Sequence, residues 1–356
     1  MPRKKTKPEN TEELPRTVGI VYSDVKREYF PTEEQYITEK NADEDAALIG
    51  KYLESLGIRV YLYPANAELP MSLCQDRPEL VINLADSLKG VESLSCAIPG
   101  VLELLDFPYT GADILGLSLD TNKFLIKKLL QQNGVPVPHY QLFNTPTDYL
   151  DPTLRFPLIS KLNSIHGSVE ISLDAISEQE KHLRDRLKYL IQTYNQPVLV
   201  EEFIVGREIV GILLEGRIKK VYLAEKVFAN QNDRFVLTTF EDQWLKEGSA
   251  TFHYVKYDDP ILKEYIKKAF DVAKMYDYGK FDVRMDQSGR YFFIDTNCNP
   301  SFGPKELDVA LSVILDMYGV PFTEILKRLL LNTVRDWAGK ERLPLPLEGE
   351  SNGGNG

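Results

Sequence analysis

Residues 280–297 read KFDVRMDQSGRYFFIDTN and are the most informative stretch of the chain. Two runs rich in apolar and aromatic residues flank Asp-Gln-Ser-Gly at 286–289, a combination that is typical of a β-hairpin. An even-length turn centred there sets Lys280 opposite Asp295 and Asp282 opposite Phe293. The stretch therefore predicts two antiparallel strands whose register can be stated residue by residue.

The two faces of this predicted hairpin differ, because side chains alternate along a strand. One face is apolar and is expected in the core, with Phe281, Val283, Met285, Phe292 and Ile294. The other face carries Lys280, Asp282, Arg284, Phe293, Asp295 and Asn297. Carboxylate and amide oxygens at this density suit Mg²⁺, which takes its remaining ligands from water and nucleotide phosphates. A solvated hairpin at a sheet edge carries similar residues, so the hairpin alone leaves both interpretations open.

The N-terminal part alternates predicted strands with helices. Apolar runs at 17–22, 58–63 and 80–84 are typical of buried strands, and an amphipathic helix ends at Gly57 between the first two. This order predicts a Rossmann-like parallel sheet. The G-x-G-x-x-G fingerprint is missing, which makes a dinucleotide-dependent dehydrogenase a poor alternative.

The rest of the chain mixes helices with extended segments. An N-capped amphipathic helix is predicted at 120–134, where Gly134 ends it. Further helices are predicted at 177–194 and 260–276. Strands are predicted at 156–162, 169–173, 197–206, 208–216 and 217–228.

Composition narrows the possible ligands and location. The net charge is -11, with 42 Lys and Arg against 53 Asp and Glu, which disfavours binding to nucleic acid or to an anionic membrane. Cys74, Cys96 and Cys298 form no closely spaced pair and fit a reducing compartment. No apolar run has the length of a membrane span or signal peptide. We expect a cytoplasmic protein that binds small molecules, with disordered ends at 1–15 and 341–356.

Several stretches resemble the D-alanine–D-alanine ligase branch of the ATP-grasp superfamily, in the order of that family and over about two-thirds of the chain. They read GVLELLDFPYTGAD, LDTNKFLIKKLLQQNGVPVP, FPLISK, PVLVEEFIVGREIVGILL and GKFDVRMDQSGRYFFIDTNCNP. The resemblance implies an α/β (α+β) ATP-grasp fold with the nucleotide between two antiparallel sheets. It implies a Rossmann-like domain at 16–115, a central subdomain at 116–200 and a C-terminal subdomain with the metal site at 201–340.

The resemblance also implies a nucleotide site. Lys123 and Lys161 would hold the phosphates of ATP as charge-assisted donors. Without the resemblance to the family, each of these lysines would be interpreted as a solvated side chain. The hinge residues would receive adenine and Glu208 the ribose hydroxyls, because these ligand groups need hydrogen-bond acceptors. The hinge comprises Glu201, Glu202, Phe203 and Ile204.

The catalytic groups follow from the same resemblance. Asp282, Asp295 and Asn297 would hold Mg²⁺ or Mn²⁺. Lys280 stands where the family has an arginine that stabilises the transferring phosphoryl group; a lysine keeps the charge and loses the bidentate fork. Gly167 and Ser168 would cover the phosphates.

Other positions depart from the family pattern. The phosphate-covering loop carries Ile165 in place of a glutamate, followed by His166, which is either a substrate contact or an ordinary loop residue. Gln243 replaces the mobile-loop lysine, with Lys246 as a candidate substitute. No G-G-x-S-x-E motif occurs near the N-terminus.

The substrate side departs as well. Glu306 stands where the family has a serine that contacts the carboxylate of the second substrate. The negative charge of Glu306 would repel that carboxylate. Together with Arg284, it suggests an unusual amino-acid partner.

We therefore predict a carboxylate–amine ligase of the acid–amino-acid type that forms a dipeptide-like amide through an acyl phosphate. Its substrates would be small molecules that differ from two D-alanines, and the resemblance implies a homodimer. One alternative is the same chemistry with another nucleophile, such as a hydroxy acid. Another is a catalytically weak or inactive ATP-binding regulatory protein of the same fold.

Overall fold

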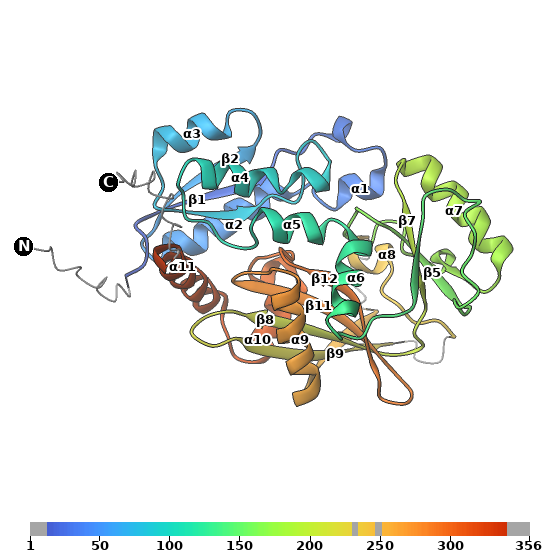
Figure 1. The fold of residues 1–356 in the computed structure, drawn as a ribbon. Coiled ribbons are helices and arrows are strands. Elements are labelled where there is room, and N and C mark those ends of the chain that lie inside the picture. Colours follow the sequence, from blue (N-terminus) through green and yellow to red (C-terminus); the bar gives the residue numbers. More distant parts are fainter. Residues whose placement is uncertain (1–12, 230–233, 246–250, 340–356) are drawn as a thin grey trace, which may run out of the picture.

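The computed structural model describes residues 13–229, 234–245 and 251–339 (Figure 1). Most of the predicted disordered ends and Lys246 lie outside these ranges. The described residues form three sheets, and the bounds of the three units given above stay predictions. Among the described helices, none is both long and apolar enough to cross a bilayer.

The N-terminal sheet is parallel, as predicted. β1 (Thr17–Ser23) lies between β2 (Arg59–Ala65) and β3 (Leu80–Leu84). The strand-helix-strand order enforces this pairing, because α2 (Ala42–Ser55) carries the chain from β1 back to the start of β2. Helices α3 (Leu69–Asp76) and α4 (Ala97–Leu104) follow β2 and β3.

The second sheet is antiparallel, with the strand order β4 (Tyr140–Phe143), β7 (Val198–Glu202), β5 (Leu158–Leu162) and β6 (Ile176–Ser177). Helix α7 (Glu180–Tyr194) packs on it, because every third or fourth residue of the helix is apolar and buried. Figure 1 shows this sheet and α7 at one end of the molecule.

The predicted strand at 169–173 is wrong. Ser168 and Glu170 adopt left-handed backbone angles, with φ of 57° and 64°, which break an extended chain. A 3₁₀ turn, η3 (Leu173–Ala175), comes next and leaves only the two residues of β6 for pairing. The Glu170 carboxylate bonds to Arg186 and Tyr189, and these long-range contacts are invisible in a local pattern.

The third sheet is the largest and is also antiparallel. Its order is β10 (Phe252–Tyr257), β9 (Lys220–Phe228), β8 (Gly206–Leu214), β11 (Tyr278–Asp286) and β12 (Tyr291–Asn297). Helix α9 (Pro260–Val272) packs on one face. Helices α10 (Ala310–Met317) and α11 (Phe322–Gly339) pack on the other, in a core shared with β1, β3 and α2. The shared core fixes the N-terminal sheet against the third sheet.

The 280–297 hairpin forms, but its predicted register is wrong. Lys280 pairs with Asn297 and Asp282 with Asp295, after which the register steps to Val283 and Phe293. Ile294 is therefore an extra residue in β12 and forms a β-bulge. A bulge changes the direction in which the neighbouring side chains point.

The bulge changes which residues share a face. Phe293, predicted on the polar face, is buried in the core against Phe281, with ring centroids 6.1 Å apart. Ile294, predicted in the core, lines the cavity described below. As a result Asp282 and Asp295 stand directly opposite each other.

Candidate active site

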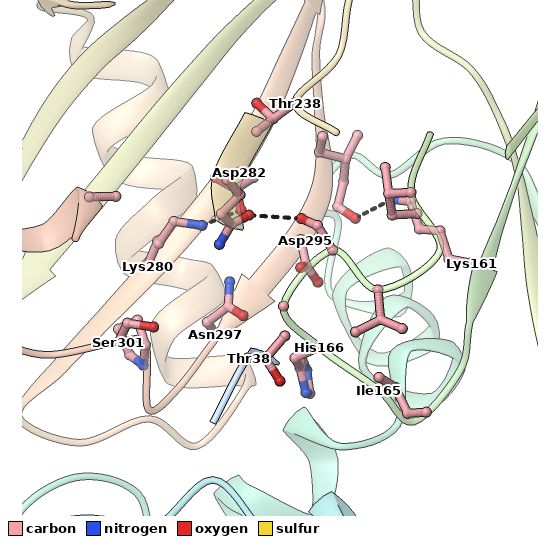
Figure 2. Close-up of a pocket in the computed structure, with 18 of the residues that line it drawn as sticks. Thr38, Lys161, Ile165, His166, Thr238, Lys280, Asp282, Asp295, Asn297 and Ser301 are labelled. Carbon is pink, nitrogen blue, oxygen red and sulfur yellow. Dashed lines mark hydrogen bonds and ion pairs between the residues drawn. The ribbon is translucent and has the colours of Figure 1, made fainter. Parts of the chain in front are cut away.

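A cavity of about 370 Å³ lies between the second and third sheets and reaches the N-terminal part (Figure 2). All but one of the residues predicted for the site line it. They are Lys123, Lys161, His166, Gly167, Ser168, Glu201, Glu202, Phe203, Ile204, Glu208, Lys280, Asp282, Arg284, Asp295 and Asn297. The exception is Glu306.

The two predicted phosphate lysines come from different elements. Lys123 begins α6 (Lys123–Gln132), and its Nζ donates to the carbonyl of Ile165 at 2.8 Å. Lys161 is on β5, and its Nζ donates to Glu201 and to the carbonyl of Ile294, both at 3.0 Å. Both ammonium groups are held on the cavity wall, where a phosphate oxygen can share or replace these acceptors.

A third lysine, Lys127, was missed. It lies one helical turn after Lys123 and is buried, with its Nζ 2.9 Å from Glu201 Oε1 and 3.1 Å from the carbonyls of Phe293 and Ile294. Burial lowers the pKa of Lys127, although Glu201 opposes this. A signal was present, since Lys127 falls on the apolar side of its helix beside Ile126.

Glu201 is therefore the centre of an ion-pair network and not a free acceptor. Its two carboxylate oxygens face Lys127 and Lys161 at 2.9 and 3.0 Å. The predicted contacts with adenine would therefore be made by the backbone groups of the hinge residues after Glu201. Glu202 also has a partner of its own, since its carboxylate accepts from the backbone N–H of Arg155 at 2.9 Å.

Arg284 lies at this hinge and not at the substrate end, which corrects its predicted position. Its guanidinium donates to Glu208 at 2.9 Å and to the carbonyl of Ile204 at 3.1 Å, and it lies over the Phe203 ring. The reason is the alternation of β11, which pairs Arg284 with Glu208 on β8.

Glu208 has a second cationic partner that sequence reasoning missed. Lys226 on β9 faces it across the ladder and donates to its carboxylate at 2.9 Å. Burial raises the pKa of Glu208, but the charges of Lys226 and Arg284 outweigh it and lower this pKa to about 2. Glu208 is therefore ionised at neutral pH and able to accept hydrogen bonds from hydroxyl groups.

The predicted metal ligands converge because of the bulge. Asp282 forms an ion pair with Lys280, and its other oxygen, Oδ1, is buried without a hydrogen-bond partner. Burial opposes ionisation of Asp295, but the charges of Lys123, His166 and other nearby cations lower its pKa to about 2. Asn297 lines the same wall.

This donor set fits a divalent ion that is shared with a nucleotide. One ionised carboxylate, one orphaned carboxylate oxygen and one amide oxygen are hard ligands of the kind that Mg²⁺ takes. In the described part of the chain, no three His, Cys, Asp or Glu side chains are grouped to hold an ion alone. Phosphate and water oxygens would have to complete the coordination.

Glu306 lies outside this cavity, so the structure does not bring it together with the other predicted site residues. It is exposed on η4 (Lys305–Leu307) and accepts a hydrogen bond from Tyr52 at 2.7 Å. The chain turns at Asp308, whose φ is 51°. The two residues that follow Glu306, Leu307 and Asp308, line the cavity instead. A turn of this kind shifts which residue faces inward without changing the sequence spacing.

The far end of the cavity carries carboxylates that sequence reasoning missed. Glu39, Asp86, Glu92 and Asp120 line it beside His166. Burial raises the pKa of Glu39 to about 7, and it also raises those of Asp86 and Asp120. No motif marks these residues, which are brought together only by the packing of the N-terminal part against α5 (Ile114–Asp120) and the 163–170 loop.

Two residues of one helix hold that loop in place. Trp244 on α8 (Phe240–Trp244) donates to the Gly167 carbonyl at 2.8 Å, and Ser168 donates to Gln243 at 2.9 Å. Gly167 has a φ of 69°, and a Cβ there would lie 2.6 Å from Thr38 Cγ2. Only glycine fits this position without moving Thr38.

We expect the Gly167→Ala variant to bind ATP at least several-fold more weakly, because the loop must move away from Thr38. Gly57→Ala is the matched control, since Gly57 also has a positive φ, of 81°, with nothing within 4 Å of its Cβ position. Both variants are expected to lose about 1 kcal/mol of stability from the left-handed backbone. Nucleotide titration and thermal unfolding separate the two effects, and equal ATP affinities in both variants would contradict this account of the loop.

Two antiparallel sheets around a lysine-lined cavity, with candidate oxygen ligands on a hairpin of one of these sheets, define an ATP-grasp protein. The family model described as D-ala D-ala ligase C-terminus matches residues 129–331, which is more than half of the chain. The chain belongs to the D-alanine–D-alanine ligase family and is a ligase-like ATP-grasp protein.

The chain is also similar to individual proteins. The chain is 26% identical over 267 residues to the D-alanine–D-alanine ligase of Aquifex aeolicus, covering 73% of this chain and 85% of that protein. It is 29% identical over 226 residues to the uncharacterized protein y4sG of Sinorhizobium fredii, covering 62% and 65%. The crystal structure of the D-alanine–D-alanine ligase from Bacillus anthracis complexed with ATP superposes with a TM-score of 0.68, at 17% identity and 91% and 99% coverage. At that identity the superposition shows the fold.

Proposed function

We propose that this protein is an ATP-dependent carboxylate–amine ligase that forms an amide bond through an acyl phosphate. One observation carries the proposal: Asp282, Asp295 and Asn297 line the same cavity as Lys123 and Lys161. Oxygen ligands for a divalent ion and cations for phosphate oxygens are the two groups that a triphosphate requires. The relatives named D-alanine–D-alanine ligase support the same reaction class.

In the first step a substrate carboxylate oxygen attacks the γ-phosphorus of ATP, the bond to the bridging oxygen breaks, and ADP leaves. Lys123 and Lys161 orient the phosphates and offset their charge. When bound by Asp282, Asp295 and Asn297, Mg²⁺ supplies further neutralisation of the phosphate charge. Lys280 stays cationic, since the charge of Asp282 outweighs burial and raises its pKa, and it is placed to stabilise oxyanion charge.

In the second step an amine attacks the acyl carbon, and the C–O bond to phosphate breaks. The cavity supplies positioning, which is worth several orders of magnitude in rate for a reaction between two bound groups. No protein nucleophile is needed. Cys298, next to Asn297, is buried and packs in the core.

We also propose that the substrate pair differs from two D-alanines. The argument from Glu306 no longer applies, because that residue lies outside the cavity. The support now comes from the covering loop, where Ile165 and His166 replace the family residues, and from the carboxylate-rich far end of the cavity. A homodimer, as in the family, remains part of this proposal.

The test is ADP release in the presence of Mg²⁺ and pairs drawn from a panel of D- and L-amino acids and simple amines. We expect release with at least one pair and background levels when the metal is chelated. ATP binding without ADP release from any pair would favour the alternative of an inactive nucleotide-binding regulator. Turnover with D-alanine alone would contradict the proposed change of substrate.

A further inference from the structure

His166 is held by one carboxylate in a single ring orientation. Its Nδ1 lies 2.7 Å from Glu92 Oε2, and its backbone N–H donates to the same carboxylate at 2.9 Å. Glu92 is itself buried. A carboxylate at Nδ1 assigns the ring proton to that nitrogen, which leaves a lone pair on Nε2.

The other ring nitrogen lacks a partner. Nε2 is buried and makes no hydrogen bond within the described residues, and the nearest carboxylate oxygen, Oδ2 of Asp120, is 3.9 Å away. That separation is too long for a hydrogen bond. A donor nitrogen that lies to one side of the line joining these two atoms can nevertheless be about 3 Å from both of them.

His166 is also next to the proposed chemistry. It lines the cavity with Lys123 and Asp295, and its charge influences the carboxylate of Asp295. Figure 2 shows His166 and Asp295 among the residues that line the cavity. It belongs to the loop that, in the family pattern, covers the phosphates. The mechanism above gives it no role.

We propose that His166 is the general base of the second step: Nε2 takes a proton from the ammonium group of the amine substrate, with Glu92 orienting the ring and Asp120 holding the ammonium beside it. The inference rests on the proposed ligase function. An amine carries its proton at neutral pH and has no lone pair with which to attack until a base removes it.

The reaction releases two protons from the amine nitrogen. Nε2 accepts one proton from R–NH₃⁺, and the free amine forms the C–N bond to the acyl phosphate. The tetrahedral adduct then loses a second proton from nitrogen as the C–O bond breaks, and that proton leaves with phosphate. His166 returns its own proton to solvent when the products leave.

The surroundings of the ring suit this role. Burial and Lys123 lower the pKa of His166, but Glu92 and Asp120 outweigh them, so the pKa is raised from its ordinary value. The charged groups that face it are Glu92, Asp120, Lys123, Asp86 and Asp295. Nε2 is buried under other protein atoms, which the amine must displace. The missing hydrogen bond favours this displacement, because a buried polar atom without a partner costs free energy.

Hydroxylamine gives a sharp test, because it attacks acyl phosphates as a neutral molecule and needs no base. The first measurement is hydroxamate formation by the wild type from ATP and each acid of the amino-acid panel. Wild-type failure with every acid would overturn the proposed ligase function itself. A wild type that forms hydroxamate establishes acyl phosphate formation, and the same acid is then used with its amine partner.

The His166→Gln variant is expected to form the amide about 10²–10⁴-fold more slowly while keeping most of its hydroxamate formation. An equal loss of both products would overturn the proposal, because it would make His166 a structural residue of the loop. His182→Gln is the matched control: His182 is partly exposed and pairs with Asp174 outside the cavity. It is expected to change neither rate.

The Glu92→Gln variant provides a second readout that does not depend on removing the ring. Glutamine keeps an acceptor for the ring and removes the charge that raises the pKa of His166. The rate of amide formation falls at low pH because the base becomes protonated, and this acid limb is expected to move to lower pH in the variant. If the acid limb does not move in the variant, it reports the titration of a group other than His166, and the proposal is overturned.

Discussion

The Asp295→Asn variant is expected to lose at least about 10²–10³-fold in ADP release, the cost of removing one preorganised electrostatic contact in an active site. The charges of Lys123, His166 and Lys161 hold the pKa of Asp295 at about 2 against burial, so the wild-type carboxylate is ionised at every working pH. Asparagine keeps the shape and removes the negative charge that a divalent ion needs. A titration of Mg²⁺ against the rate is expected to shift to higher concentration in the variant.

The matched control for this experiment is Asp286→Asn on the same hairpin. Asp286 caps the turn by accepting from Ser288 and Arg290 and does not line the cavity. This change is expected to cost stability alone and to leave the Mg²⁺ dependence as in the wild type. If Asp295→Asn consumed ATP at the wild-type rate with an unchanged Mg²⁺ titration, the metal site assigned to the hairpin would be wrong.

The hairpin illustrates what the sequence could and could not predict. Its two strands, its turn and its oxygen ligands follow from local alternation and from the Asp-Gln-Ser-Gly turn. The bulge at Ile294 does not, because an extra residue leaves both flanking runs looking equally regular. The register error exchanged Phe293 and Ile294 between core and cavity, yet Asp282 and Asp295 kept their predicted role.

The cations behind the site were harder to predict for another reason. Lys127 and Lys226 are buried, but their partners, Glu201 and Glu208, lie 74 and 18 residues away. A lone lysine on a helix or strand is ordinarily solvated. Only the packing of α6 beside the second and third sheets, and the pairing of β9 with β8, show that each lysine neutralises a buried carboxylate.

The far end of the cavity had no local signal at all. Glu39 and Glu92 come from segments outside the stretches that resemble the family, and their arrangement depends on the N-terminal part meeting the 163–170 loop. The sequence leaves two interpretations of His166 open, a substrate contact or an ordinary loop residue. Its hydrogen bonds to Glu92 are a fact of the tertiary structure, which is why a base could not be assigned from sequence.

The Arg284→Met variant is expected to lose about 1.5–3 kcal/mol of unfolding free energy, because it removes a charge-assisted hydrogen bond from the buried Glu208 and leaves it with one cation in place of two. Arg290→Met is the control, since Arg290 is exposed and pairs with Asp286 at the surface, where an ion pair is worth at most about 1 kcal/mol. Urea unfolding at about pH 7.5 measures both variants. Equal losses would show that the buried network does not stabilise the fold.

The loss of unfolding free energy in Arg284→Met is expected to depend on pH, because it depends on the charge of Glu208. Glu208 has a pKa of about 2 in the folded protein against an ordinary value of 4.5. The stability from its ionised form, on the order of 3 kcal/mol, is therefore complete above about pH 5 and disappears as the pH falls from 4.5 toward 2. Without Arg284 this pKa rises, so the wild type's advantage over Arg284→Met is expected to shrink as the solution is acidified. An advantage that grew toward low pH would mean that Arg284 stabilises the protein through its packing on Phe203 and not through the charge of Glu208.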